Sequence, residues 1–224
     1  MRSPQSVPEL PTLDTEVYRL TTDQRPRSIL ASLVVDHALL NDGPVYWIDA
    51  LNHATTDSIS AVAPSVLILN RIQVARGFTP YQHASIAEAL LERAEMEPPS
   101  LIVAPALDAL YRESMTGIEG SELLARTVSR LARLKRQYDC PVLLTTTRDD
   151  ELSEPIAAAV SAHLECEQTP YGPRFVGDDF ETLVYPVGEG LIQTTIAYWQ
   201  SIIEARKPLY STQETPAISG RSTA

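Results

Sequence analysis

The chain has 224 residues, a formal net charge of −11 and 44% hydrophobic residues. This length suits one α/β domain with irregular ends, and the hydrophobic content can fill a sizeable core. No apolar run approaches the ~18 residues that a membrane span needs. The N-terminus also lacks the apolar centre of a signal peptide. We therefore expect a cytoplasmic protein without a membrane partner.

The cations are unevenly distributed between the two basic residue types. Lys135 and Lys207 are the only lysines among 18 basic residues. An acidic, lysine-poor composition resembles that of proteins from salt-loving archaea, so the net charge predicts a halophilic surface rather than a function. At molar salt, charge effects are screened within ~3 Å, and the acidity argues only weakly against nucleic acid.

Metal-binding and nucleophilic motifs are not evident in the sequence. Cys140 and Cys166 lie beside or within apolar runs, which predicts buried, reduced thiols. No Gly-x-Ser-x-Gly elbow is present. The four histidines show no ligand spacing and favour core, cap or surface roles: His37, His53, His83 and His163. We expect no metal site and no catalytic residue.

The N-terminal half alternates strand-like and helix-like segments. Residues 1–13 are Pro-rich and predict a mobile arm. Pro26 is suitably placed as the first residue of a helix, and helical spacing continues to Leu40. Weaker helical patterns cover residues 57–62 and 81–95. Short apolar or alternating runs predict strands at 16–20, 45–48, 66–69 and 72–76.

Residues 100–147 form the central unit. Two apolar runs without alternation, 101–104 and 142–145, are typical of strands that helices cover on both faces of a parallel sheet. Between them, residues 121–138 have apolar and arginine-rich sides at helical spacing. A strand, a crossover helix and a strand make one right-handed βαβ unit.

The C-terminal part has a different character. Strand candidates at 162–167, 174–176, 181–187 and 191–198 are separated by turns suited to antiparallel hairpins. The Ser/Thr/Pro-rich residues 207–224 predict a disordered tail. A single domain is thus expected over residues 14–206.

Several blocks in this order resemble the ATPase core of the RecA superfamily, in particular archaeal RadA and its paralogues. They are 16–18, 46–49, 72–78, 109–126 and 142–147, and the likeness spans Glu16 to Trp199. The resemblance implies a three-layer α/β fold within the P-loop NTPase superfamily. Its central sheet would be mainly parallel, with a C-terminal antiparallel β extension.

The turn at the P-loop position departs from the family pattern. A P-loop needs G-x-x-x-x-G-K-[ST], because glycine lets backbone N–H groups wrap the phosphates. Here no glycine precedes Gly43, and Pro26 removes one N–H donor. Arg27 and Ser28 stand where the family has Lys-Ser. They are either solvated residues or, as the less favoured interpretation, a residual phosphate grip.

The other phosphate-handling positions that the resemblance implies are also changed. The Walker B strand runs on through Ala104 without a carboxylate until Asp108, and Leu51 stands at the catalytic glutamate position. Thr146 and Thr147 replace the amide side chains of the sensor strand. These losses predict a pseudo-ATPase without a cofactor. Asp49, at a strand end, either binds a ligand or caps the next turn.

Arginines remain as candidate contacts. Arg126, Arg130 and Arg133 could meet DNA or an acidic partner, or form the solvated face of a helix. Arg112 precedes the segment that resembles the first DNA loop, and the second is acidic here, so DNA binding would be indirect.

Three hypotheses follow for the function. The first is a non-catalytic RadA-like accessory or regulatory subunit in recombination and repair, whose partner is a RadA-like recombinase or another paralogue. The second is an enzyme or sensor that still binds nucleotide weakly through Arg27, Ser28 and the helix N-terminus. The third is a signalling protein that resembles the circadian-clock-type RecA relatives.

Overall fold

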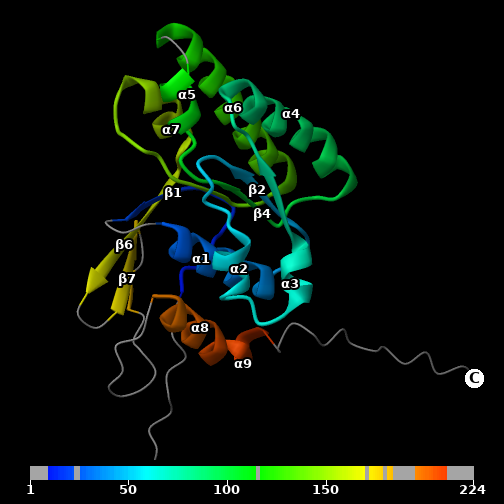
Figure 1. Cartoon of the computed structure of the whole chain (residues 1–224), viewed down its shortest axis with the longest axis vertical. Helices are drawn as coiled ribbons and strands as arrows, with labels where there is room; N and C mark the ends of the chain where they lie inside the picture. Colours follow the sequence, from blue (N-terminus) through cyan, green and yellow to red (C-terminus); the bar gives the residue numbers. More distant parts are fainter. Residues whose placement is uncertain are drawn as a thin grey trace, which may run out of the picture.

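The computed structural model describes residues 10–22, 26–114, 117–169, 172–178, 181–183 and 195–210. Its centre is an eight-stranded sheet with the order β3-β2-β4-β5-β1-β6-β7-β8 (Figure 1). The strands are β1 (Val17–Thr22), β2 (Val45–Asp49), β3 (Ile72–Arg76), β4 (Leu101–Ala104), β5 (Val142–Leu144), β6 (Ala162–Thr169), β7 (Gly172–Gly177) and β8 (Glu181–Leu183).

The six strands from β3 to β6 run parallel, whereas β7 pairs antiparallel with both β6 and β8. The prediction of a mainly parallel sheet with an antiparallel C-terminal extension is therefore confirmed.

Helices cover both faces of the sheet (Figure 1). One layer contains α1 (Arg27–Leu40), α2 (Thr56–Ser60), α3 (Val66–Arg71), α8 (Thr195–Ala205) and α9 (Lys207–Tyr210). The other contains α4 (Pro80–Met96), α5 (Ala109–Ser114), α6 (Gly117–Tyr138) and α7 (Glu154–Ala159), with the 3-10 turn η1 (Glu151–Ser153) before α7.

The strands divide their side chains between two cores. In β2, Val45 and Trp47 belong to the core beneath α1, and Tyr46 and Ile48 belong to the core beneath α4 and α6. This split follows from the two-residue period of a strand. It explains why the central strands lack a polar face, and it gives the fold three layers.

Two expected strands are helical. Residues 66–69 lie in α3, where Val66 and Leu67 are exposed and Ile68 is buried. The strand beside β2 is instead β3, which begins directly after α3. Residues 195–198 open α8, and residues 191–194 lie outside the described part. Trp199, Ile202 and Ile203 recur at helical spacing and enter the core of α1, so tertiary packing decides this segment.

The packed domain is longer than residues 14–206 at both ends. Leu10 and Leu13, expected in the arm, are buried in the core of α1. Tyr210 in α9, expected in the tail, is buried too. Residues 1–9 and 211–224, and the part of the expected strand from residue 184 to 187, lie outside the described residues.

Candidate functional site

The positions that sequence analysis singled out follow the carboxyl ends of neighbouring parallel strands. Arg27 and Ser28 open α1, the first element after β1. Asp49 ends β2, Asp108 lies beyond β4, and Thr147 lies beyond β5. In a parallel sheet these ends meet at one edge, which is where α/β folds usually bind ligands. The fold thus brings the candidate positions to the same edge.

The start of α1 holds two of the predicted site residues. Pro26 is the N-cap of α1, with φ −70°, and makes no side-chain capping hydrogen bond. The Arg27 side chain is exposed, and Ser28 is half-buried, with its carbonyl accepting a hydrogen bond from Ser32 Oγ at 2.8 Å. Residues 23–25 lie outside the described part of the chain.

Asp49 is fully buried and occupied by internal donors. Its Oδ1 accepts hydrogen bonds from the backbone N–H groups of His53 and Ala54, at 2.9 and 3.0 Å. Its Oδ2 accepts from Arg76 Nε at 2.7 Å. Of the two interpretations of Asp49, the contacts favour the cap of the following turn.

The two residues after this strand have an unusual backbone. Leu51 and Asn52 have φ values of +56° and +59°, in the left-handed region that disfavours residues with a Cβ atom. The Leu51 side chain is 42% exposed. A strained, exposed leucine therefore stands where the family resemblance places a catalytic glutamate.

Asp108 is the centre of a closed polar network. It is fully buried, and its Oδ1 accepts from the Thr147 backbone N–H at 2.7 Å. Its Oδ2 accepts from Thr147 Oγ1 at 2.6 Å and from Arg112 Nε at 2.5 Å. The turn that leads to Asp108 is pinned to β5, since the Ala106 N–H donates to Thr145 Oγ1 at 2.8 Å.

The guanidinium of Arg112 also makes its hydrogen bonds within the protein. Its terminal nitrogens donate to the two carboxylate oxygens of Asp150, at 2.6 and 2.8 Å, and to the carbonyl of Arg148 at 3.3 Å. The hydrogen bonds to Asp150 and Asp108 raise the pKa of Arg112 above its usual value. The same contact lowers the pKa of the Asp150 carboxyl. Arg112 is an internal counter-ion here, although we expected a contact for DNA or a partner.

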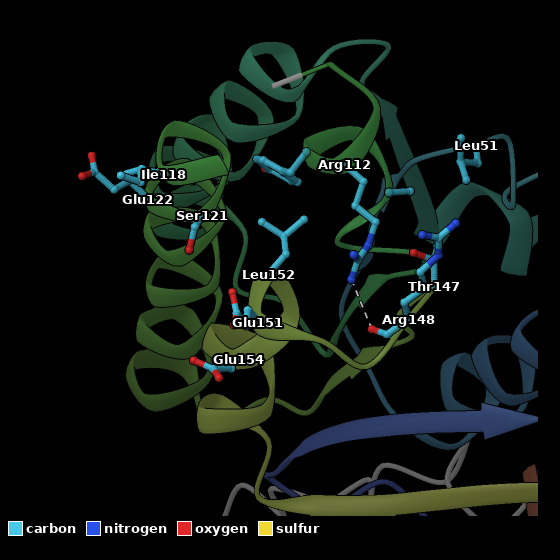
Figure 2. A pocket seen from close by; sticks show the side chains of 12 residues that line it. Leu51, Arg112, Ile118, Ser121, Glu122, Thr147, Arg148, Glu151, Leu152 and Glu154 are labelled. Atoms are coloured by element: carbon cyan, nitrogen blue, oxygen red, sulfur yellow. Dashed lines mark hydrogen bonds between the residues drawn. The ribbon is translucent and has the colours of Figure 1, made fainter. Parts of the chain in front are cut away.

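A cleft of about 1060 Å³ lies beside this network. Figure 2 shows Arg112 and Leu152 in its middle, Ser121 of α6 on one side, and Leu51 and Thr147 on the other. Leu51 and Ile118 add apolar surface to the lining.

The charges in the lining that are not neutralised within the network are mainly acidic. Glu151 and Glu154 are exposed and have no ion pair among the described residues, and Glu122 has only a 3.7 Å contact with Arg126. Arg148 is the cation that remains beside them. An acidic lining repels phosphate groups, so this cleft is poorly suited to a nucleotide or to a DNA strand.

The arginines of α6 are not gathered into one free cationic surface. Arg126 is exposed beside Glu122, and Arg130 is 3.1 Å from Glu88 and donates to the Ala84 carbonyl at 3.2 Å. Arg133 is exposed and has no ion pair among the described residues. Arg130 thereby ties α6 to α4, which is a structural role.

A buried polar chain lies behind the cleft. The hydroxyl of Tyr111 makes two hydrogen bonds, one with His83 Nδ1 at 3.0 Å and one with Thr127 Oγ1 at 2.9 Å. Burial lowers the pKa of His83 to about 4, so its ring is neutral at pH 7. His83 Nε2 is buried and has no hydrogen-bond partner among the described residues. Burial likewise raises the pKa of Tyr111 to about 12.

Sequence reasoning missed the network around Asp108. The available signal was the spacing of Asp108 and Arg112, because residues i and i+4 on a helical turn are ion-pair neighbours. The contribution of Asp150 had no local signal, since it lies 38 residues further along the chain.

Comparison with known protein families finds no family model that matches this sequence, and comparison with curated proteins finds no similar sequence. Within the described ranges, no three His, Cys, Asp or Glu side chains gather as a metal-binding group. None of the described helices is long and apolar enough to cross a bilayer.

Proposed function

We propose that this chain is a non-catalytic RecA/RadA-like paralogue that acts as an accessory or regulatory subunit in DNA recombination and repair. It would work through protein–protein contacts. One observation supports the loss of catalysis: the Asp108 carboxylate, beyond β4, is buried and already accepts two hydrogen bonds from Thr147 and one from Arg112. A buried carboxylate whose charge an arginine neutralises attracts a magnesium ion less strongly.

The arrangement of the sheet supports the RecA-like part of the proposal. The four altered phosphate-handling positions follow β1, β2, β4 and β5, which are parallel, and the antiparallel strands come after them in the chain. This is the order that the resemblance implies. In such an arrangement the positions could have shared one phosphate site, and here Pro26 and Leu51 occupy two of them.

The open edge of the sheet supports the contact with another protein. Subunits of the RecA family associate edge to edge, and β3 is the terminal strand on one side of this sheet. Val74 in β3 is 43% exposed. An edge strand with an exposed apolar side chain is a ready template for pairing with another chain.

Affinity capture of the tagged chain from its native high-salt lysate tests this function. We expect a RecA-family recombinase or paralogue among the captured proteins. Val74→Lys should abolish its capture, because charge on an edge strand opposes pairing. Val66→Lys is the matched control, since Val66 is also exposed but lies on α3. Capture of no such protein, or equal capture by both variants, would count against the proposal.

Nucleotide binding is tested separately. Weak ATP binding would use Arg27, Ser28 and the N-terminus of α1, where the Arg27 side chain is exposed. We expect no rise in melting temperature with millimolar Mg-ATP at native salt. A rise that Arg27→Ala removes would support the nucleotide-binding alternative instead. A deletion strain with normal ultraviolet survival would favour the signalling alternative.

A further inference from the structure

Exposed apolar side chains gather at the carboxyl edge of the sheet, around the acidic cleft. Leu51 and Ile118 line the cleft and are 42% and 79% exposed. Phe78 and Tyr81 are 73% and 58% exposed. We call these four residues the apolar rim. Contiguous exposed apolar groups bordered by polar ones are typical of interaction sites.

Two hydrogen bonds place the outer members of the rim beside the cleft. The N–H of Gly77, directly before Phe78, donates to the Asp49 carbonyl at 3.1 Å, close to where β2 leads into Leu51. Tyr81 Oη donates to Glu119 Oε1 at 2.7 Å, next to Ile118. The starts of α4 and α6 are thereby held together at this edge.

The charges of the cleft specify what can lie against the rim. The Arg112 guanidinium and the Asp108 carboxylate neutralise each other, and they also bond to Asp150 and Thr147 respectively. The charges left for an incoming group are those of Arg148 and of three carboxylates, Glu122, Glu151 and Glu154. Leu152 lies between α6 and Arg112, next to Glu151 (Figure 2).

We propose that the cleft and its apolar rim bind a segment of a protein partner that carries arginine or lysine next to apolar side chains. The basic groups would meet Glu151 and Glu154, and the apolar groups would cover Leu152 and the rim. This inference rests on the proposed function, in which the chain acts through protein contacts. It adds a second surface, at the carboxyl edge rather than along β3.

A second copy of this chain is the less suitable occupant, because the net charge of −11 makes two copies repel each other. Nucleic acid is also disfavoured, because the carboxylates of Glu122, Glu151 and Glu154 line the cleft itself and repel phosphate groups at short range. Both are outcomes of the test below.

The test uses fluorescein-labelled peptides of known composition and the full chain. Leu-Arg-Gly repeats probe the proposed chemistry, Leu-Glu-Gly repeats reverse its charge, and Ser-Arg-Gly repeats remove its apolar part. By fluorescence anisotropy at about 0.15 M salt, where surface charges still act, we expect the Leu-Arg-Gly peptide to bind most tightly.

The variant Glu151→Lys/Glu154→Lys should weaken that binding at least about tenfold, because two attractive charges become repulsive. Glu92→Lys/Glu95→Lys changes the net charge equally on the exposed face of α4 and should leave binding unchanged. Glu151→Gln/Glu154→Gln keeps the side-chain size if the lysine variant is poorly folded, and should weaken binding less than the lysine pair.

The proposal is overturned if the wild-type chain binds none of the peptides, or if the two lysine variants bind the peptide equally. Tighter binding of the Leu-Glu-Gly peptide or of a single-stranded oligodeoxynucleotide would assign an anionic ligand instead. Self-association that Glu151→Lys/Glu154→Lys abolishes would assign a second copy. If Val74→Lys still loses recombinase capture while no peptide binds, the inference at the cleft fails and the proposed function stands.

Discussion

Arg112 Nε lies 2.5 Å from Asp108 Oδ2, and this i,i+4 ion pair spans the first turn of α5, which Asp108 directly precedes. Asp108 is fully buried, and the Arg112 side chain is only 15% exposed. Asp150, from the loop after β5, completes the neutralisation of Arg112. The counter-ion of Asp108 is therefore an arginine side chain of the same protein. The pair lies at the edge of the sheet where α/β proteins usually bind a ligand.

Removing this cation should destabilise the protein. Arg112→Met would leave the Asp108 carboxylate buried with only Thr147 as a donor, and breaking a buried pair in this way typically costs about 3 kcal/mol. Arg126→Met is the matched control, because the Arg126–Glu122 pair is exposed and 3.7 Å apart, and should cost less than about 0.5 kcal/mol. Urea denaturation measures both values, and similar losses in the two variants would contradict the role of Arg112.

The local chemistry around this pair explains what sequence could and could not predict. Asp108 and Arg112 are i and i+4 on one helical turn, so their contact was readable in principle. Asp150 and Thr147 join them only because β4 and β5 are neighbours in the sheet. The network around Asp108 depends on this long-range strand pairing and has no local signature in the sequence.

The elements show the same division between local and tertiary signals. The sequence predicts β4, β5 and α6 correctly. Burial on both faces gives β4 and β5 unbroken apolar runs, and burial on one face gives α6 apolar residues at helical spacing. Val66 and Leu67 read as a strand but form α3, since the sheet position beside β2 belongs to β3. Trp199 begins the buried stripe of a helix whose partner, α1, is remote in sequence.

His83 should make the protein less stable as the pH falls. Its folded pKa of about 4 lies below the ordinary value of 6.5, because burial disfavours the charged ring. Between these pH values the unfolded chain binds a proton that the folded chain excludes. The stability linked to His83 is therefore complete above pH 6.5 and falls by on the order of 3 kcal/mol as the pH approaches 4.

His83→Gln should flatten the fall of unfolding free energy in this pH window, while keeping a hydrogen-bonding group for Tyr111. Burial also lowers the pKa of His37, so part of the slope will remain. His163→Gln, on the exposed side of β6, should keep the wild-type slope. Urea titrations at several pH values between 4 and 6.5 give the unfolding free energy of each variant. If wild type and His83→Gln show the same dependence on pH, His83 is not the group responsible.

Leu51 offers a test of backbone strain. Its φ of +56° disfavours any residue with a Cβ atom by about 1 kcal/mol relative to glycine. Leu51→Gly should therefore be about 1 kcal/mol more stable than Leu51→Ala, since both variants lose the same partly exposed side chain. Differential scanning calorimetry can compare the two. An alanine variant as stable as the glycine variant would mean that the left-handed turn carries no strain.

Asp36 and Arg206 fasten the C-terminal helices to α1. Arg206 Nε is 2.7 Å from Asp36 Oδ1, both residues are buried, and Tyr210 Oη donates to the same oxygen at 2.6 Å. Arg206→Met would leave the Asp36 carboxylate buried without its cation, at a cost of about 3 kcal/mol or more. Trp199 on α8 would then become more exposed to water, because α8 would leave its place against α1.

The double variant Asp36→Leu/Arg206→Met separates the charge effect from the loss of packing. It removes the unpaired charge along with its partner, so it should be more stable than Arg206→Met alone even though Tyr210 loses its acceptor. In a Trp47→Phe background, Trp199 is the remaining tryptophan of the chain, and its fluorescence should shift to the red in Arg206→Met before global unfolding in urea. If the double variant is instead the less stable of the two, packing rather than charge holds α8 and α9 in place.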